Sequence, residues 1–269
     1  MRKHYTRACN FYYGTNAKNL IKKKLALPLC GNKNIAFDNI EILSRDKKTK
    51  LIHIKNIEKL SNPIKSIVSK DLKNIVLKRK NLNKYINISE PLIMGVLNLT
   101  PDSFSDGGLY NQSKKAFSHI NNLISGGADI IDIGGESTRP GSRDVPHKIE
   151  WKRLEKVLIN FKKKFPKIFL SIDTRKSDVM IKAINHKSDL INDVSGFNYD
   201  QEAIEKIKNY DVWKVLHHMQ GTPNTMQIKP NYKNVLLDIY DFFEKKINID
   251  FKKFKYKKFI IDPGIGFGK

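Results

Sequence analysis

The sequence of 269 residues predicts an α/β fold of the (β/α)₈ TIM-barrel type over residues 91–269, preceded by a basic N-terminal extension over residues 1–90. Short apolar runs alternate with amphipathic stretches of helical length, which is the pattern of a parallel sheet covered by helices. Each apolar run also ends in polar or Gly-rich residues. Polar residues at the carboxyl ends of successive strands are typical of the active-site face of a barrel, whereas a doubly wound sheet gathers them near one switch point.

Six apolar runs account for the expected barrel strands, and five amphipathic stretches account for the helices. We expect strands at 92–99, 129–134, 168–173, 190–194, 212–218 and 259–262, and helices at 113–125, 147–164, 177–186, 201–208 and 232–250. A complete barrel has eight strands and typically about 250 residues. We therefore expect about six strands here, in a barrel that is incomplete at its C-terminal end.

The extension has a different character. A strand over 35–43, a polar turn over 44–50 and a strand over 51–54 predict a hairpin. Two Lys-rich apolar segments, 64–68 and 72–77, fit either helix or strand. The hairpin is antiparallel and cannot supply missing barrel strands, which are parallel. No motif assigns a role to the extension, so the simplest interpretation is a small basic subdomain.

Composition excludes several classes of protein. Hydrophobic residues make up 40% of the chain and aromatic residues 10%, which is enough apolar surface for a core and argues against disorder. No apolar run reaches the roughly 18 residues of a membrane helix, and the N-terminus lacks a secretory signal. The start is free of acids until Asp38, as in organellar transit peptides, but it is rich in Lys rather than in Arg and Ser. Two cysteines fit a reducing compartment, and we expect a cytoplasmic protein.

The net charge of +23 raises the question of a nucleic-acid partner. Residues 1–90 contain 21 basic and 6 acidic residues, so most of the excess lies in the extension. However, 42 of the 50 basic residues are Lys, whereas Arg is the residue preferred for contacts with bases and phosphates. We expect no nucleic-acid partner and no membrane partner, and keep binding through residues 1–90 as a lesser alternative.

Three polar residues end strands of the predicted sheet: Asp173, Asn192 and Asp262. A carboxylate accepts paired N–H bonds, and an amide both donates and accepts. Together these groups suit a flat heterocycle that carries several hydrogen-bond donors. The alternative for a single aspartate is a helix N-cap, and Asp173 is the strongest case.

Two loops and a histidine pair also carry polar chemistry. Asn98 precedes an acidic, Gly-containing loop over 100–108 and could ligate Mg²⁺ through its amide oxygen, with plain turn chemistry as the alternative. Arg139 could hold an anion, with a surface salt bridge as the alternative. His217 and His218 are adjacent in a strand and point to opposite faces, so we reject a zinc site and expect that one of them faces the pocket.

Six segments together resemble the dihydropteroate synthase family, which binds pterins and is the target of sulfonamides. They occur in the family's order and lie at 94–108, 132–141, 171–174, 191–193, 218–221 with 225–227, and 262–269. The first two are long and specific. The resemblance implies an enzyme that joins 6-hydroxymethyl-7,8-dihydropterin diphosphate to p-aminobenzoate and releases diphosphate.

The resemblance also implies roles for individual residues. Asp173, Asn192, Asp262 and Thr138 would bind the pterin. Asn98 would bind Mg²⁺ together with the diphosphate. The p-aminobenzoate pocket would be formed by Ser103, Phe104, Thr138, Pro140 and Phe267. Catalysis would involve Asp102, Arg139 and Asp173, and the protein would be a homodimer.

Two departures from the family keep alternatives open. The family continues with a seventh strand that bears a Lys and an eighth that bears an Arg and a His. If the protein ended at Lys269, a non-catalytic pterin-binding protein would be an alternative. A related pterin-binding methyltransferase is the other alternative, and the loops at 101–108 and 137–141 argue against it.

Overall fold

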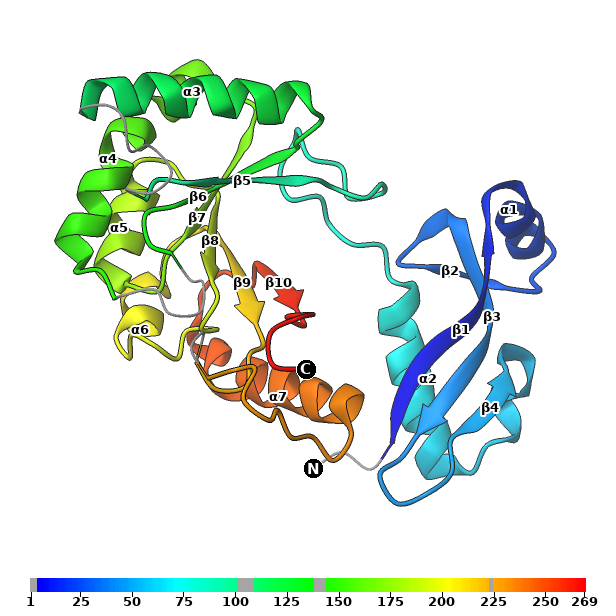
Figure 1. The fold of residues 1–269 in the computed structure, drawn as a ribbon. Coiled ribbons are helices and arrows are strands. Elements are labelled where there is room, and N and C mark those ends of the chain that lie inside the picture. The colour runs from blue at the N-terminus through cyan, green and yellow to red at the C-terminus, as the bar shows by residue number, and fades with distance from the viewer. Residues whose placement is uncertain (1–3, 101–108, 138–143, 223–224) are drawn as a thin grey trace. The chain divides into compact units, whose positions relative to one another are not determined.

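The computed structural model describes residues 4–100, 109–137, 144–222 and 225–269 (Figure 1). The chain divides into two compact units, residues 1–81 and 82–269. Residues 82–90, which the sequence analysis assigned to the extension, therefore belong to the second unit. Within the described ranges, no helix is both long enough and apolar enough to cross a membrane.

The first unit is an antiparallel sheet with two α-helices and one 3-10 helix. Its strands are β1 (Tyr5–Tyr13), β2 (Leu27–Leu29), β3 (Asn32–Leu43) and β4 (Lys50–His53), and its helices are α1 (Gly14–Lys22), the 3-10 helix η1 (Ile54–Lys59) and α2 (Asn62–Val76). The sheet order is β1-β3-β2, and β4 also pairs with β3. The predicted β3–β4 hairpin is confirmed. The two ambiguous apolar segments form the single helix α2, whose Val68 packs against Phe37 and Ile40 of β3.

The second unit is a six-stranded parallel sheet wrapped by helices (Figure 1). The strands are β5 (Met94–Asn98), β6 (Ile130–Gly134), β7 (Phe169–Asp173), β8 (Leu190–Asp193), β9 (Trp213–His217) and β10 (Phe259–Asp262). The helices are α3 (Leu109–Ser125), α4 (His147–Lys164), α5 (Ser177–Asn185), α6 (Ala203–Ile207), α7 (Val235–Ile249) and the 3-10 helix η3 (Phe251–Lys253). Consecutive strands are neighbours throughout, in the order β5 to β10. This is the order of a barrel, so the predicted partial barrel is confirmed.

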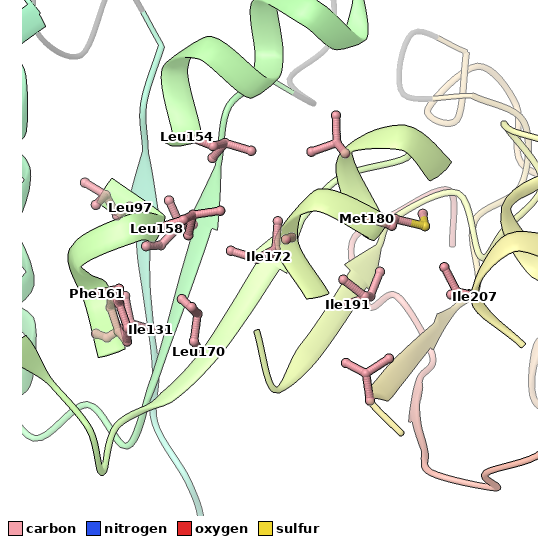
Figure 2. Packing of buried hydrophobic residues seen from close by; sticks show 14 of the residues in the cluster. Leu97, Ile131, Leu154, Leu158, Phe161, Leu170, Ile172, Met180, Ile191 and Ile207 are labelled. Atoms are coloured by element: carbon pink, nitrogen blue, oxygen red, sulfur yellow. The ribbon is translucent and has the colours of Figure 1, made fainter. Parts of the chain in front are cut away.

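Successive side chains along each strand point to opposite faces of this sheet, so each face has its own set of residues. The outer face is apolar, with residues such as Ile131, Leu170 and Ile172 packed against the helices (Figure 2). Helix α4 contributes Leu154, Leu158 and Phe161 at spacings of four and three residues, which places them on one side of the helix. The hydrophobic effect of this burial holds the helices on the sheet.

The inner face changes character along the strands. At the amino ends it is apolar, with Ile130, Phe169, Leu190 and Val215 packed against Ile86. The indole Nε1 of Trp213 donates to the carbonyl of Leu82 at 2.9 Å, which ties the segment before β5 to this cluster. Residues 82–92 therefore cover the amino ends of the strands, and the polar inner residues lie toward the carboxyl ends.

Candidate functional site

Four residues of neighbouring strands form one row across the carboxyl end of the sheet. Asn98 of β5 pairs with Gly134 of β6, Gly134 pairs with Asp173 of β7, and Asp173 pairs with Asn192 of β8. Residues that pair in register point to the same face of a sheet. Asn98, Asp173 and Asn192, which are predicted site residues, are therefore brought together on the inner face.

Gly134 leaves space between two of these side chains. A Cβ at this position would lie 3.2 Å from Oδ1 of Asn98 and 3.5 Å from Oδ2 of Asp173. Both oxygens therefore lie over the backbone of β6, where a side chain at position 134 would crowd them. Two oxygens placed in this way can bind a hard cation or the polar edge of a substrate.

One buried acid of the site escaped the sequence analysis. Asp132 lies two residues before Gly134 on β6 and is 4% exposed. The amide Nδ2 of Asn192 donates to its Oδ2 at 3.0 Å. The sequence did contain a signal for Asp132. It is an acid inside the apolar run 130–133, and charged residues are rare in the middle of a buried strand.

Burial and mutual repulsion raise the pKa of the carboxyl groups in and beside this row. Burial raises the pKa of Asp173 well above its usual value, and the negative charges of Asp132 and Asp193 raise it further. Burial also raises the pKa of Asp132. Both effects follow from the cost of placing negative charge away from water and close to other negative charge.

Asp262 belongs to a second group, at the end of β10. Its Oδ1 accepts from the Gly264 amide at 2.8 Å, and its Oδ2 lies 3.9 Å from Nε2 of His217. The Phe267 ring meets the His217 ring edge-on, with 4.8 Å between centroids. A Cβ on Gly264 would lie 2.1 Å from the carbonyl oxygen of His218, so this turn requires glycine. Asp262 and Phe267 are thus linked through His217.

The two histidines separate as predicted. His217 is buried beside Asp262, and its Nδ1 lies 2.7 Å from the carbonyl oxygen of Val194. The His218 ring instead packs edge-on against Phe242 of α7, at 4.7 Å. Burial lowers the pKa of His217, and that of His218 falls to about 4 for the same reason. The described residues contain no group of three or more His, Cys, Asp or Glu side chains that could hold a metal.

The helix-cap interpretation of Asp173 is wrong. The N-cap residue of α5 is Lys176 and that of α6 is Glu202, and neither of these two side chains makes a cap bond. Asp200, not Asp173, accepts from the backbone N–H of Ser177. For Asp262, in contrast, the turn bond to Gly264 is present alongside its position at the strand end.

A buried network of ion pairs connects the segment after β6 to the segment after β7. The carboxylate of Glu136 accepts from the Val145 amide at 2.9 Å, from Arg175 Nε at 3.2 Å and from Lys176 Nζ at 2.8 Å. Lys176 Nζ also donates to Glu150 at 2.9 Å. The network joins residues after β6 to residues after β7. The sequence analysis did not identify it, because its members are spread over 40 residues.

Six predicted residues lie outside the described part of the chain: Asp102, Ser103, Phe104, Thr138, Arg139 and Pro140. Their roles stay predictions.

Comparisons with known proteins identify the family of this chain. The family model described as "Pterin binding enzyme" matches residues 94–269, starting at the first residue of β5. This chain belongs to the pterin-binding enzyme family. Among curated relatives, the dihydropteroate synthase of Escherichia coli K12 is 38% identical over 185 residues, which cover 68% of this chain and 65% of the relative.

Solved structures agree with the family assignment. The Yersinia pestis dihydropteroate synthase with a sulfonamide drug complex matches with a TM-score of 0.60 and 38% identity, covering 68% of this chain and 66% of that one. The Burkholderia cenocepacia dihydropteroate synthase complexed with 7,8-dihydropteroate matches with a TM-score of 0.58 and 35% identity, over 68% and 62% of the two chains. This pterin-binding chain spans 65% of the length of the Escherichia coli relative.

Proposed function

We propose that this chain provides the pterin-binding part of a dihydropteroate synthase. The reaction joins the amine nitrogen of p-aminobenzoate to the exocyclic methylene of 6-hydroxymethyl-7,8-dihydropterin diphosphate, and the C–O bond to diphosphate breaks. The observation that carries the proposal is the row of Asn98, Asp173 and Asn192 on the inner face of a pterin-binding barrel. The names of the relatives support it.

In this proposal Asp173, Asn192 and Asp262 bind the pterin ring, with Thr138 beside them. Carboxyl and amide side chains match a heterocycle that carries both N–H donors and ring-nitrogen acceptors. Loss of diphosphate leaves positive charge on the pterin, which nearby carboxylates stabilise. The site thus combines recognition of the ring with stabilisation of the charge that develops on it.

The p-aminobenzoate amine needs placement more than activation. We assign that role to Ser103, Phe104, Thr138, Pro140 and Phe267, and we assign catalytic roles to Asp102, Arg139 and Asp173. Holding the amine beside the methylene and excluding water lowers the entropic part of the barrier.

A Mg²⁺ ion fits the residues at the end of β5. The oxygen Oδ1 of Asn98 lies over Gly134 at the carboxyl end of the sheet, and amide oxygen is a ligand that Mg²⁺ accepts. Mg²⁺ is commonly held by one or two protein oxygens together with substrate phosphates, so a site without an all-protein cage suits it. When bound, the ion would neutralise charge on the diphosphate.

We also propose that the protein is a homodimer in the cytoplasm. Both cysteines, Cys9 and Cys30, are free thiols, which suits a reducing compartment. Analytical ultracentrifugation of the purified protein tests the dimer.

Calorimetry and turnover test the proposed function separately. We expect purified protein to bind the dihydropterin diphosphate in the presence of Mg²⁺ and to form dihydropteroate when p-aminobenzoate is added. Asp173→Asn should lower kcat/KM by at least about tenfold, the loss of one charged hydrogen bond. The matched control, Asp211→Asn, changes an exposed acid just before β9 and should leave kcat/KM within about twofold of wild type.

The outcomes separate the alternatives. Absence of dihydropteroate in the full assay would refute the synthase proposal. Binding of the pterin without turnover would instead support a non-catalytic pterin-binding protein.

A further inference from the structure

Asp132 occupies a position where an apolar residue would be more stable. It lies on the inner face of β6 between Ile131 and Ile133, two side chains of the outer core, and is 4% exposed. Its neighbours in the sheet are Val96 and Ser171. A buried carboxyl group costs folding free energy unless its oxygens are satisfied.

Only one of its oxygens is satisfied by the described residues. Oδ2 accepts from Asn192 at 3.0 Å, whereas Oδ1 is buried and accepts no hydrogen bond of ordinary geometry from them, with the Ser171 hydroxyl of β7 as the nearby donor that lowers the pKa of the acid. An unpaired buried acceptor lowers the stability of the folded state. The stability of the sheet therefore does not explain an acid at this position, and its contact with Asn192 does.

The contact determines which end of the Asn192 amide is available. Asn192 carries an NH₂ donor and a carbonyl acceptor on the same planar group, and the two ends are interchangeable by rotation. A carboxylate oxygen accepts only from the NH₂ end. While Nδ2 is engaged by Asp132, the carbonyl oxygen of Asn192 is left to accept a hydrogen bond from a ligand on the inner face.

We propose that Asp132 is a positioning residue that orients the Asn192 amide, so that the site presents an acceptor to an N–H group of the pterin. This inference rests on the proposed pterin-binding function. Asp132 acts through Asn192 and sets the hydrogen-bond pattern that the site recognises. The ligand chemistry that it selects is a heterocycle with an N–H donor at that edge.

A double-mutant cycle tests the proposal. Calorimetry with 6-hydroxymethyl-7,8-dihydropterin diphosphate and Mg²⁺ is performed on wild type, Asp132→Ala, Asn192→Ala and the double variant. Asp132→Ala should raise Kd about tenfold in the wild-type background, which corresponds to one hydrogen bond. In the Asn192→Ala background the same change should raise Kd less than about twofold, because its effect passes through Asn192.

Two further measurements separate positioning from a general structural defect. Asp132→Asn keeps an acceptor oxygen for Asn192 and should recover most of the affinity that Asp132→Ala loses. In steady-state kinetics, Asp132→Ala should raise KM for the pterin substrate and leave KM for p-aminobenzoate unchanged. Tryptophan fluorescence checks folding, and Asp132→Ser replaces Asp132→Ala in the cycle if the latter does not fold.

Each outcome has a defined meaning. Equal increases in Kd in both backgrounds, or wild-type affinity in Asp132→Ala, would overturn the positioning role and leave the proposed function intact. If wild-type protein does not bind the pterin diphosphate, the proposed function fails, and this inference fails with it.

Discussion

Lys214 is a buried lysine whose charge should make the stability of the barrel unit depend on pH. Its side chain is 0% exposed on β9. Its Nζ donates to the carbonyl of Tyr210 at 3.2 Å and lies 4.8 Å from the centroid of the Phe254 ring. Burial lowers its pKa from 10.5 to about 8. The folded state therefore loses this proton at a lower pH than the unfolded state does.

The sign follows from the protons bound in each state. Below pH 8 both states hold the proton, and the folded state carries the full cost of a buried charge. Between about pH 8 and pH 10.5 the unfolded state binds more protons, so the free energy of unfolding rises with pH. From pH 7 to pH 9.5 the gain spans roughly 1.5 pH units, which at about 1.4 kcal/mol per unit is about 2 kcal/mol.

Urea unfolding followed by tryptophan fluorescence measures this gain. Both tryptophans, Trp151 and Trp213, lie in the unit 82–269, so the signal reports the barrel unit. The free energy of unfolding of wild type minus that of Lys214→Met should increase by about 2 kcal/mol between pH 7 and pH 9.5. For the exposed control Lys152→Met the corresponding difference should change by less than about 0.5 kcal/mol. An unchanged difference for Lys214→Met would refute the reasoning.

Three further substitutions test the packing and the ion network. Lys176→Met leaves two buried glutamates without their shared cation and should destabilise the barrel unit by about 3–5 kcal/mol in the same urea assay; a loss below about 1 kcal/mol would show that the network is solvated. Phe161→Ala opens a cavity in the outer core and should lower the free energy of unfolding by about 3–5 kcal/mol. Ile159→Ala, on the exposed side of α4, should lower it by less than about 1 kcal/mol. Equal losses would contradict the assignment of the two helix faces. In the first unit, Phe37→Ala should accelerate amide hydrogen exchange in β1 and β3, and the exposed Leu51→Ala should not; matching exchange rates would place Phe37 outside the core.

The strands and helices of the barrel unit could be predicted from local patterns. A run such as 168–173 is mostly apolar, up to the aspartate that ends it, because both faces of a parallel strand are covered. Helix α4 follows from the spacing of Leu154, Leu158 and Phe161. The polar row at the carboxyl end also followed, because parallel strands end at one edge and Asp173 and Asn192 each close a strand.

Features that depend on distant partners could not be predicted in this way. Strand β1 is interrupted by polar residues and becomes a strand through its pairing with β3, about 30 residues later in the chain. Residues 82–90 look like part of a basic extension, yet Leu82 and Ile86 lie in the cluster at the amino ends of the barrel strands.

The sequence by itself determined the alternating strand–helix order, the ends of the strands and the polar residues placed there. These depend on residue periodicity and on turn residues within short stretches of chain. Only the tertiary structure decided that Asp132 holds the amide of Asn192, that His217 rather than His218 faces Asp262, and that Lys176 joins Glu136 to Glu150. Each of these contacts joins side chains on different strands or loops, and such contacts form only when the whole sheet and its helices pack together.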